Sequence, residues 1–160
     1  MKRIWAPWRM KLFSTHQPGC VFCRVQKEQD DLANLLLVRG ETAFIILNRY
    51  PYTSGHLLVV LNDHLDSLEA ATPECRSEMM ELTNRCIKVL RKVYSPDGFN
   101  WGANIGEAAG AGIPGHAHMH VVPRWSGDAS FMSVLGEARV LPEDLSETYR
   151  RLRAAWDGAE

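Results

Sequence analysis

Short apolar segments separated by turn residues dominate the first half of the chain. Residues 35–38 and 42–48 are rich in leucine, isoleucine and phenylalanine, and Arg39-Gly40-Glu41 between them is typical of a turn. After a loop at residues 51–55, the run His-Leu-Leu-Val-Val-Leu-Asn at 56–62 is apolar again. Runs of this length bounded by turn residues indicate strands. Three strands are therefore expected in this part of the chain.

One long amphipathic helix should follow. Thr72 suits the N-cap, and Pro73 suits the first helical position, where its missing N–H costs nothing. Apolar residues then recur with the three-and-four spacing of one buried helix face. These residues are Met79, Met80, Thr83, Cys86, Ile87, Leu90 and Val93. The sequence Ser-Pro-Asp-Gly at 95–98 is expected to end the helix.

The second half adds two strands, at 99–104 and 117–122, and a final helix that starts at Pro142. The apolar face of that helix would consist of Leu145, Tyr149, Leu152 and Trp156. This order of elements predicts one α+β domain built on an antiparallel sheet. Its parts would be an irregular N-terminal segment (1–31), a core (32–125) and a C-terminal extension with a helix (126–160).

Composition and charge narrow the functional classes. The net charge of −1 argues against broad nucleic-acid binding, which needs a strongly basic face. No run approaches the roughly twenty apolar residues of a membrane helix, so neither a membrane nor a nucleic-acid partner is expected. A start without a signal-peptide pattern predicts a cytoplasmic protein with reduced cysteines. Trp5 and Trp8 predict that the N-terminal segment packs on its own core or on a partner subunit.

The most informative segment is His-Ala-His-Met-His-Val-Val at 116–122. Side chains alternate between the two faces of a strand, so His116, His118 and His120 would share one face, about 6.6 Å apart. The residues between them would point into a core. Three imidazoles are costly to bury without partners, so this spacing indicates a functional site.

Three functional hypotheses fit this strand. The histidines could bind the metal of a phosphohydrolase, because imidazole is the commonest zinc ligand. One of them could instead attack phosphorus, because imidazole is largely neutral at pH 7. The preceding loop at 106–115 has four glycines, whose backbone N–H groups could approach a phosphate, and this favours phosphoryl chemistry. A module that senses nucleotides without turnover is the third hypothesis.

The histidine strand matches the His-φ-His-φ-His-φ-φ signature of the histidine-triad (HIT) superfamily. Residues 47–52 and 54–60 resemble the earlier strand-loop-strand of that family. Trp5-Ala-Pro-Trp-Arg9 and residues 131–149 resemble its bacterial branch of diadenosine tetraphosphate hydrolases and phosphorylases. The resemblance covers nearly the whole chain. It implies a HIT-like fold with about five antiparallel strands, one long helix and a C-terminal helix, and a homodimer whose subunits join their sheets.

The resemblance also implies a reaction. His118 would attack the α-phosphate of a dinucleoside polyphosphate and form a covalent nucleotidyl-histidine, which water or inorganic phosphate then releases. His120 would bind the α-phosphate, and His56 would be a fourth histidine beside the triad. The family's polar pair before the triad, which assists the leaving group, is replaced by Gly112 and Ile113. The resemblance therefore assigns no leaving-group donor.

Further substrate contacts are expected around these histidines. Asn48 resembles the family position that contacts the ribose, and Phe44 and Ile46, on the same strand face, could flank the base. Candidates for the phosphate side are Asn104, Gly110 and Gly112. Arg124 could contact a distal phosphate or form a surface ion pair.

Cys20-Val-Phe-Cys23 is a second pattern that suggests chemistry. Alone it fits a redox pair, half of a metal site or two free thiols, and it lacks the strand-then-helix setting of a thioredoxin site. Related histidine-triad proteins with this cysteine pair bind zinc with two additional histidines. That resemblance implies a structural Zn²⁺ held by Cys20, Cys23, His64 and His116. No organic cofactor is expected.

Overall fold

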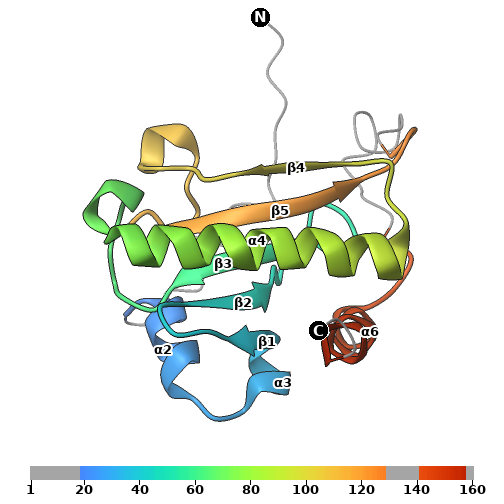
Figure 1. Ribbon diagram of the computed structural model, residues 1–160, viewed down its shortest axis with the longest axis horizontal. Helices are drawn as coiled ribbons and strands as arrows, with labels where there is room; N and C mark the ends of the chain where they lie inside the picture. Colours follow the sequence, from blue (N-terminus) through green and yellow to red (C-terminus); the bar gives the residue numbers. More distant parts are fainter. Residues whose placement is uncertain (1–18, 129–140, 158–160) are drawn as a thin grey trace, which may run out of the picture.

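The computed structural model describes residues 19–128 and 141–157. In this part of the chain, five strands form one antiparallel sheet in the order β1-β2-β3-β5-β4 (Figure 1). The strands are β1 (Leu36–Arg39), β2 (Ala43–Leu47), β3 (Leu57–Leu61), β4 (Gly98–Gly102) and β5 (His118–Arg124). The predicted α+β class and the predicted five-stranded antiparallel sheet are both confirmed.

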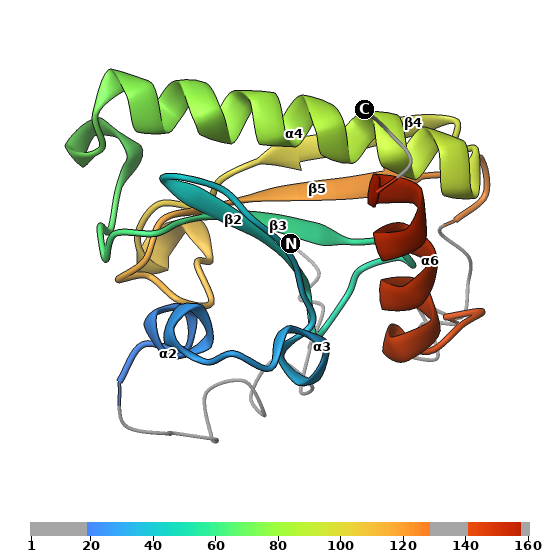
Figure 2. The ribbon, with the colours of Figure 1, turned by 60° about the horizontal axis from the view of Figure 1, so that its bottom comes forward.

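Helices cover both faces of the sheet. They are α2 (Val21–Lys27), α3 (Asp31–Asn34), α4 (Pro73–Tyr94) and α6 (Leu145–Asp157), with short 3-10 turns η1 (Leu68–Ala70) and η2 (Glu107–Ala109). Helix α4 crosses one face, and α2 lies against the opposite face (Figure 2). Of the helices in the described ranges, none has the length and apolar character needed to cross a membrane.

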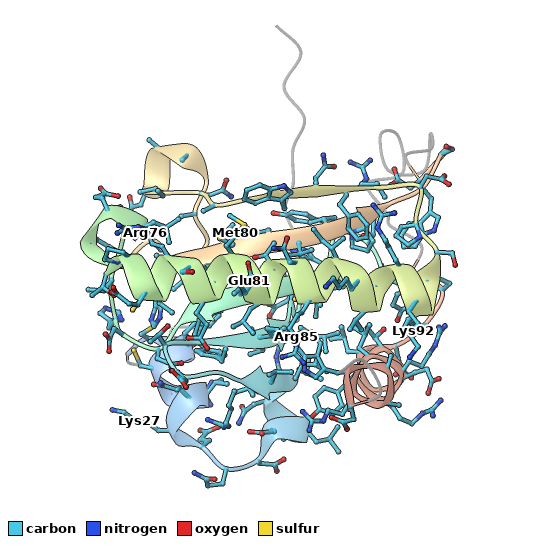
Figure 3. The ribbon with its side chains drawn as sticks, in the orientation of Figure 1. Lys27, Arg76, Met80, Glu81, Arg85 and Lys92 are labelled. Atoms are coloured by element: carbon cyan, nitrogen blue, oxygen red, sulfur yellow. The ribbon has the colours of Figure 1, made fainter. Side chains whose placement is uncertain are left out.

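Helix α4 forms where the sequence predicts it. The Thr72 hydroxyl accepts a hydrogen bond from the Cys75 amide, Pro73 opens the helix, and Ser95 ends it with a left-handed φ of 46°. Its buried residues are Met79, Leu82, Thr83, Cys86, Val89 and Leu90. Met80 was expected on this face but is 39% exposed, on the side of α4 seen in Figure 3. Met79 takes the inward position because it is in phase with Thr83 and Cys86.

Strands β2 and β3 are buried on both faces, which explains their continuous apolar sequences. Ile45 and Val59 belong to the large core under α4 and α6, whereas Phe44 and Val60 belong to a smaller cluster under α2. The apolar cluster on the face that α2 covers is the smaller of the two. It is this face that carries the histidines.

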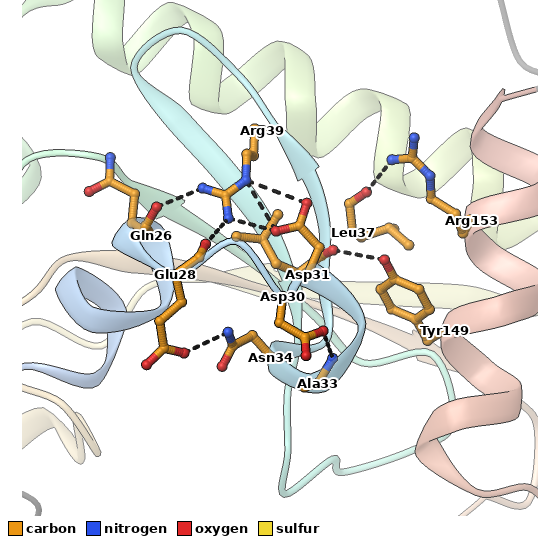
Figure 4. Close-up of polar contacts among 11 residues, drawn as sticks. Gln26, Glu28, Asp30, Asp31, Ala33, Asn34, Leu37, Arg39, Tyr149 and Arg153 are labelled. Atoms are coloured by element: carbon orange, nitrogen blue, oxygen red, sulfur yellow. Dashed lines mark hydrogen bonds and ion pairs between the residues drawn. The ribbon is translucent and has the colours of Figure 1, made fainter.

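The prediction that residues 1–31 are irregular is wrong where the structure describes them, because residues 21–27 form α2. A helix of seven residues is not stable alone, so side chains must hold it. The Arg39 guanidinium donates to the carbonyls of Gln26 and Glu28 and forms an ion pair with Asp31 at 2.6 Å (Figure 4). This clamp ties the end of α2 to β1. Trp5 and Trp8 lie outside the described residues.

Helix α6 lies beside β1, the first strand of the sheet. The Tyr149 hydroxyl donates to the Leu36 carbonyl at 3.1 Å, and Arg153 donates to the Leu37 carbonyl at 2.6 Å (Figure 4). These two hydrogen bonds tie α6 to the backbone of the edge strand β1. The helix starts at Leu145 rather than at the predicted Pro142, and Leu152 and Trp156 are buried as expected.

Candidate active site

The pairing of β3 with β5 places the histidines on the α2 face. His118 lies opposite Val60 and His120 lies opposite Leu58, and both aliphatic partners belong to the cluster under α2. Ala117, Met119 and Val121 point into the core under α4. The alternation predicted for this strand is confirmed.

His118 is 5% exposed, and its Nδ1 lies 2.8 Å from the backbone carbonyl oxygen of His116. A carbonyl only accepts hydrogen bonds, so this contact assigns the ring proton to Nδ1 and leaves a lone pair on Nε2. Burial lowers the pKa of His118, which keeps the ring neutral. The arrangement suits a nitrogen nucleophile.

His56 and His120 form a pair with a defined direction. The backbone N–H of Tyr52 donates to Nδ1 of His56 at 3.1 Å, so the proton of His56 is on Nε2. That Nε2 lies 2.9 Å from Nδ1 of His120 and donates to it. The proton of His120 is then on its own Nε2, which makes this atom a hydrogen-bond donor.

Aromatic rings enclose the histidines. The Phe22 ring of α2 lies 5.1 Å from the His118 ring and 6.4 Å from the Phe44 ring, in edge-on contacts. Ile46 lies in the same cluster, and Ile113 packs against it. Phe44 and Ile46 thus lie on the face of the sheet that carries His118. Phe22 was missed, because its position between two cysteines gave no sign of the helix that carries it.

The other predicted substrate residues are placed as follows. The side-chain nitrogen of Asn48 lies 3.3 Å from Nδ1 of His56, so Asn48 belongs to the site. Asn104 follows β4 just beyond Gly102, which pairs with His120. Gly110 and Gly112 lie in the loop that leads to β5, and Gly110 has a left-handed φ of 84°. Their contacts with phosphate stay predictions.

Arg124 is engaged elsewhere. Its guanidinium forms two hydrogen bonds with the Asp128 carboxylate, at 2.5 and 2.6 Å, and another with Asn100. Of the two roles left open by the sequence, the surface ion pair is the one the structure contains.

A second cluster lies at the start of β5 and consists of Cys20, Cys23, His64 and His116. Their ligand atoms all lie within 4.8 Å of one another. Nδ1 of His116 is 3.3 Å from Sγ of Cys20 and 3.3 Å from Nδ1 of His64, and Cys23 Sγ is 3.3 Å from Nδ1 of His64. The structure therefore brings together all four residues predicted to bind zinc.

The donor set fits a tetrahedral zinc ion. Usual Zn–S and Zn–N bond lengths place neighbouring ligand atoms about 3.3–3.8 Å apart, close to the distances found here. Nε2 of His116 lies 2.8 Å from the Leu61 carbonyl oxygen, which assigns the proton to Nε2 and leaves Nδ1 as a ligand. Burial lowers the pKa of His116, and burial together with Cys20 raises the pKa of Cys23. A divalent cation would stabilise the thiolates.

An antiparallel sheet with alternating histidines on one strand, and a fourth histidine paired with the last of them, defines the histidine-triad class of proteins. The chain belongs to the HIT domain family, whose model matches residues 29–127.

Known proteins are similar to this chain over most of its length. AP-4-A phosphorylase of Mycobacterium tuberculosis is 36% identical over 166 residues, which cover 98% of this chain and 85% of that protein. The crystal structure of a Zn-bound histidine triad family protein from Mycobacterium smegmatis is 35% identical, with a TM-score of 0.71, and covers 89% of this chain and 98% of that chain. A histidine triad nucleotide-binding protein from Sulfolobus tokodaii is 25% identical, with a TM-score of 0.70 over 87% of this chain and 93% of that one. These matches confirm the predicted family and fold.

Gly55, which precedes His56, generates the first prediction. Its φ is +79°, and a Cβ there would lie 2.9 Å from Leu90 and 3.0 Å from Tyr94 on α4. Gly55→Ala should therefore cost about 2–3 kcal/mol of the free energy of unfolding, measured by urea denaturation, because strain and overpacking add.

Gly127→Ala is the matched control, since Gly127 has a φ of +80° and nothing within 4 Å of its virtual Cβ. Gly127→Ala should lower the free energy of unfolding by only about 1–2 kcal/mol, because only the backbone strain of the left-handed φ contributes. Equal costs for the two variants would show that the contact with α4 does not constrain Gly55.

Proposed function

We propose that this chain is a HIT-type nucleotide hydrolase or phosphorylase that cleaves dinucleoside polyphosphates at an α-phosphate through a covalent intermediate on His118. The observation that carries this proposal is the hydrogen bond from Nδ1 of His118 to the His116 carbonyl, which leaves Nε2 as the nucleophile. The 36% identity with AP-4-A phosphorylase over nearly the whole chain supports the enzyme class.

Two displacement steps follow from this geometry. Nε2 of His118 attacks the α-phosphorus and forms an N–P bond, while the bond to the bridging oxygen breaks and its electron pair leaves with the remaining phosphates. Nε2–H of His120 donates to a phosphate oxygen as negative charge develops there. Water or inorganic phosphate then attacks the same phosphorus, and the N–P bond breaks. Water as acceptor makes the enzyme a hydrolase, and phosphate makes it a phosphorylase.

The surrounding residues would bind the nucleotide. Phe22, Phe44 and Ile46 offer a largely apolar wall for the base, since aromatic and aliphatic side chains bind flat rings without a specific charge. Asn48 would contact the ribose. The backbone at Asn104, Gly110 and Gly112 would face the phosphates.

The structure argues against the hypothesis of a catalytic metal on three histidines. The one group of residues in the described ranges that could hold a metal includes His116 but neither His118 nor His120. A nucleotide sensor without turnover remains the alternative that the next experiment tests.

His118→Ala should lose turnover by about 10⁴-fold or more, while nucleotide affinity changes by less than about tenfold, as expected for a lost nucleophile. Purified enzyme is incubated with diadenosine tetraphosphate, with and without inorganic phosphate, and the products are separated by chromatography. ATP plus AMP without phosphate indicates hydrolysis, and ADP plus ATP only with phosphate indicates phosphorolysis. Labelled nucleotide should remain on the denatured wild-type enzyme. An active His118→Ala variant, or a wild-type enzyme without turnover, would contradict the proposal.

We also propose that Cys20, Cys23, His64 and His116 hold a structural zinc ion, which is supported by their distances and by the Zn-bound relative. Cys23→Ser should abolish stoichiometric zinc in metal analysis and lower the melting temperature by about 10 °C, because metal binding contributes to folding. Cys75→Ser, which changes a half-buried cysteine outside the cluster, is the control and should keep the metal. Zinc retained by Cys23→Ser would rule out this ligand set.

A homodimer through β4 is the proposed assembly. Strand β4 is the last strand of the sheet, and its Trp101 is 53% exposed. A strand edge with a large exposed ring is typical of a subunit contact. A cytoplasmic location is proposed as well, supported by the four cysteines of the described residues, none of which is in a disulfide.

Trp101→Lys should convert the dimer to a monomer, so that light scattering gives the 18.1 kDa of one chain instead of twice that mass. Leu32→Lys is the matched control, because Leu32 is 59% exposed and lies on α3. A mass that Trp101→Lys leaves unchanged, or that Leu32→Lys changes equally, would place the interface elsewhere.

A further inference from the structure

Tyr52 contacts both members of the His56–His120 pair. Its ring lies 4.7 Å from the His56 ring and 6.1 Å from the His120 ring, and the planes of Tyr52 and His120 differ by only 10°. Such spacing is that of offset-stacked aromatic rings. Its backbone N–H donates to Nδ1 of His56. One residue thus meets the pair through its ring and through its main chain.

The loop that carries Tyr52 is fixed on both sides of the sheet. The Thr53 hydroxyl donates to the Pro123 carbonyl of β5 at 2.9 Å. Gly55 packs against Leu90 and Tyr94 of α4. The Tyr52 amide is therefore held at a constant position relative to β5 and its histidines.

A backbone N–H can donate a hydrogen bond but cannot accept one. This asymmetry determines which ring of the His56–His120 pair carries the shared proton. Two neutral imidazoles that share one hydrogen bond can exist with the shared proton on either ring. The Tyr52 amide removes this freedom, because it requires a lone pair on Nδ1 of His56. Nε2 of His56 must then be the donor, Nδ1 of His120 the acceptor, and Nε2 of His120 the carrier of the outer proton.

We propose that Tyr52 is a positioning residue that keeps His120 in the Nε2–H tautomer and holds its ring in plane with its own. It acts through His120 and makes no contact with the reacting atoms. The tautomer order stands on the structure alone, whereas its effect on turnover rests on the function proposed above. A residue that only packs would affect stability but not the position of the proton.

The direct test is ¹⁵N nuclear magnetic resonance of the histidine side chains in the metal-loaded enzyme without nucleotide. Wild type should show His56 and His120 protonated on Nε2 and His118 protonated on Nδ1. Tyr52→Phe keeps the ring and should preserve this pattern. Tyr52→Leu removes the flat ring but keeps the main-chain N–H, so its His56 should stay protonated on Nε2. Thr53→Val removes the bond that holds this N–H in place relative to β5, and its His56 and His120 signals should shift toward a mixture of tautomers.

Kinetics provide the second readout. Tyr52→Leu should lower kcat about tenfold with KM within about twofold, while Tyr52→Phe stays within about twofold of wild type. Tyr50→Ala is the control, because Tyr50 lies in the same loop and is 50% exposed. Thr53→Val loosens the loop by removing its bond to Pro123, and it should lower kcat as well if the tautomers mix.

Unchanged tautomers in Thr53→Val would overturn the inference, and so would an unchanged kcat in Tyr52→Leu or equal losses in Tyr52→Phe and Tyr52→Leu. The nuclear magnetic resonance result needs no turnover. An enzyme inactive on diadenosine tetraphosphate but with the expected tautomers would refute the proposed function and leave the ordering role of Tyr52 intact.

Discussion

The antiparallel register between β3 and β5 is the constraint on which the whole arrangement of histidines depends. With Leu58 opposite His120, His56 lies diagonally next to His120 at one end of the paired strands. At the other end the same register brings His64 to His116. A slip by one residue would turn the histidines of β5 into the core under α4. One set of backbone hydrogen bonds therefore defines both the candidate active site and the candidate metal centre.

The elements that the sequence predicts well are those with strong local signals. The cap at Thr72 and Pro73 and the periodic apolar face identify α4, and the period of two identifies β5. Helix α2 has no such signal. It is too short for a clear period, it follows Pro18-Gly19, and it is stabilised by Arg39, a residue distant in sequence. Patterns in the local sequence do not predict a helix that is stabilised by another element.

The candidate site likewise contains residues that the sequence predicts and residues that it does not. His118, His120 and His56 are recognisable from their motif, and the resemblance to related proteins adds the candidate zinc ligands. Phe22 and Tyr52 could not be predicted, because each acts through a ring that approaches a histidine only after the chain has folded. The direction of the hydrogen bond between His56 and His120 depends on one main-chain amide, which no side-chain pattern reveals.

The two edge strands of the sheet, β1 and β4, differ in what contacts them. Tyr149 and Arg153 bind the carbonyls of Leu36 and Leu37 along β1, whereas β4 ends the sheet on the other side with Trp101 exposed. A sheet with two open edges can add copies without limit and grow into a fibre. Within the described residues, side chains of α6 bond to the backbone of β1, so strand addition would be favoured at β4 and the proposed dimer would leave little room for further copies. The C-terminal helix would thus oppose polymerisation through β1, at the edge of the sheet away from β5 and its histidines.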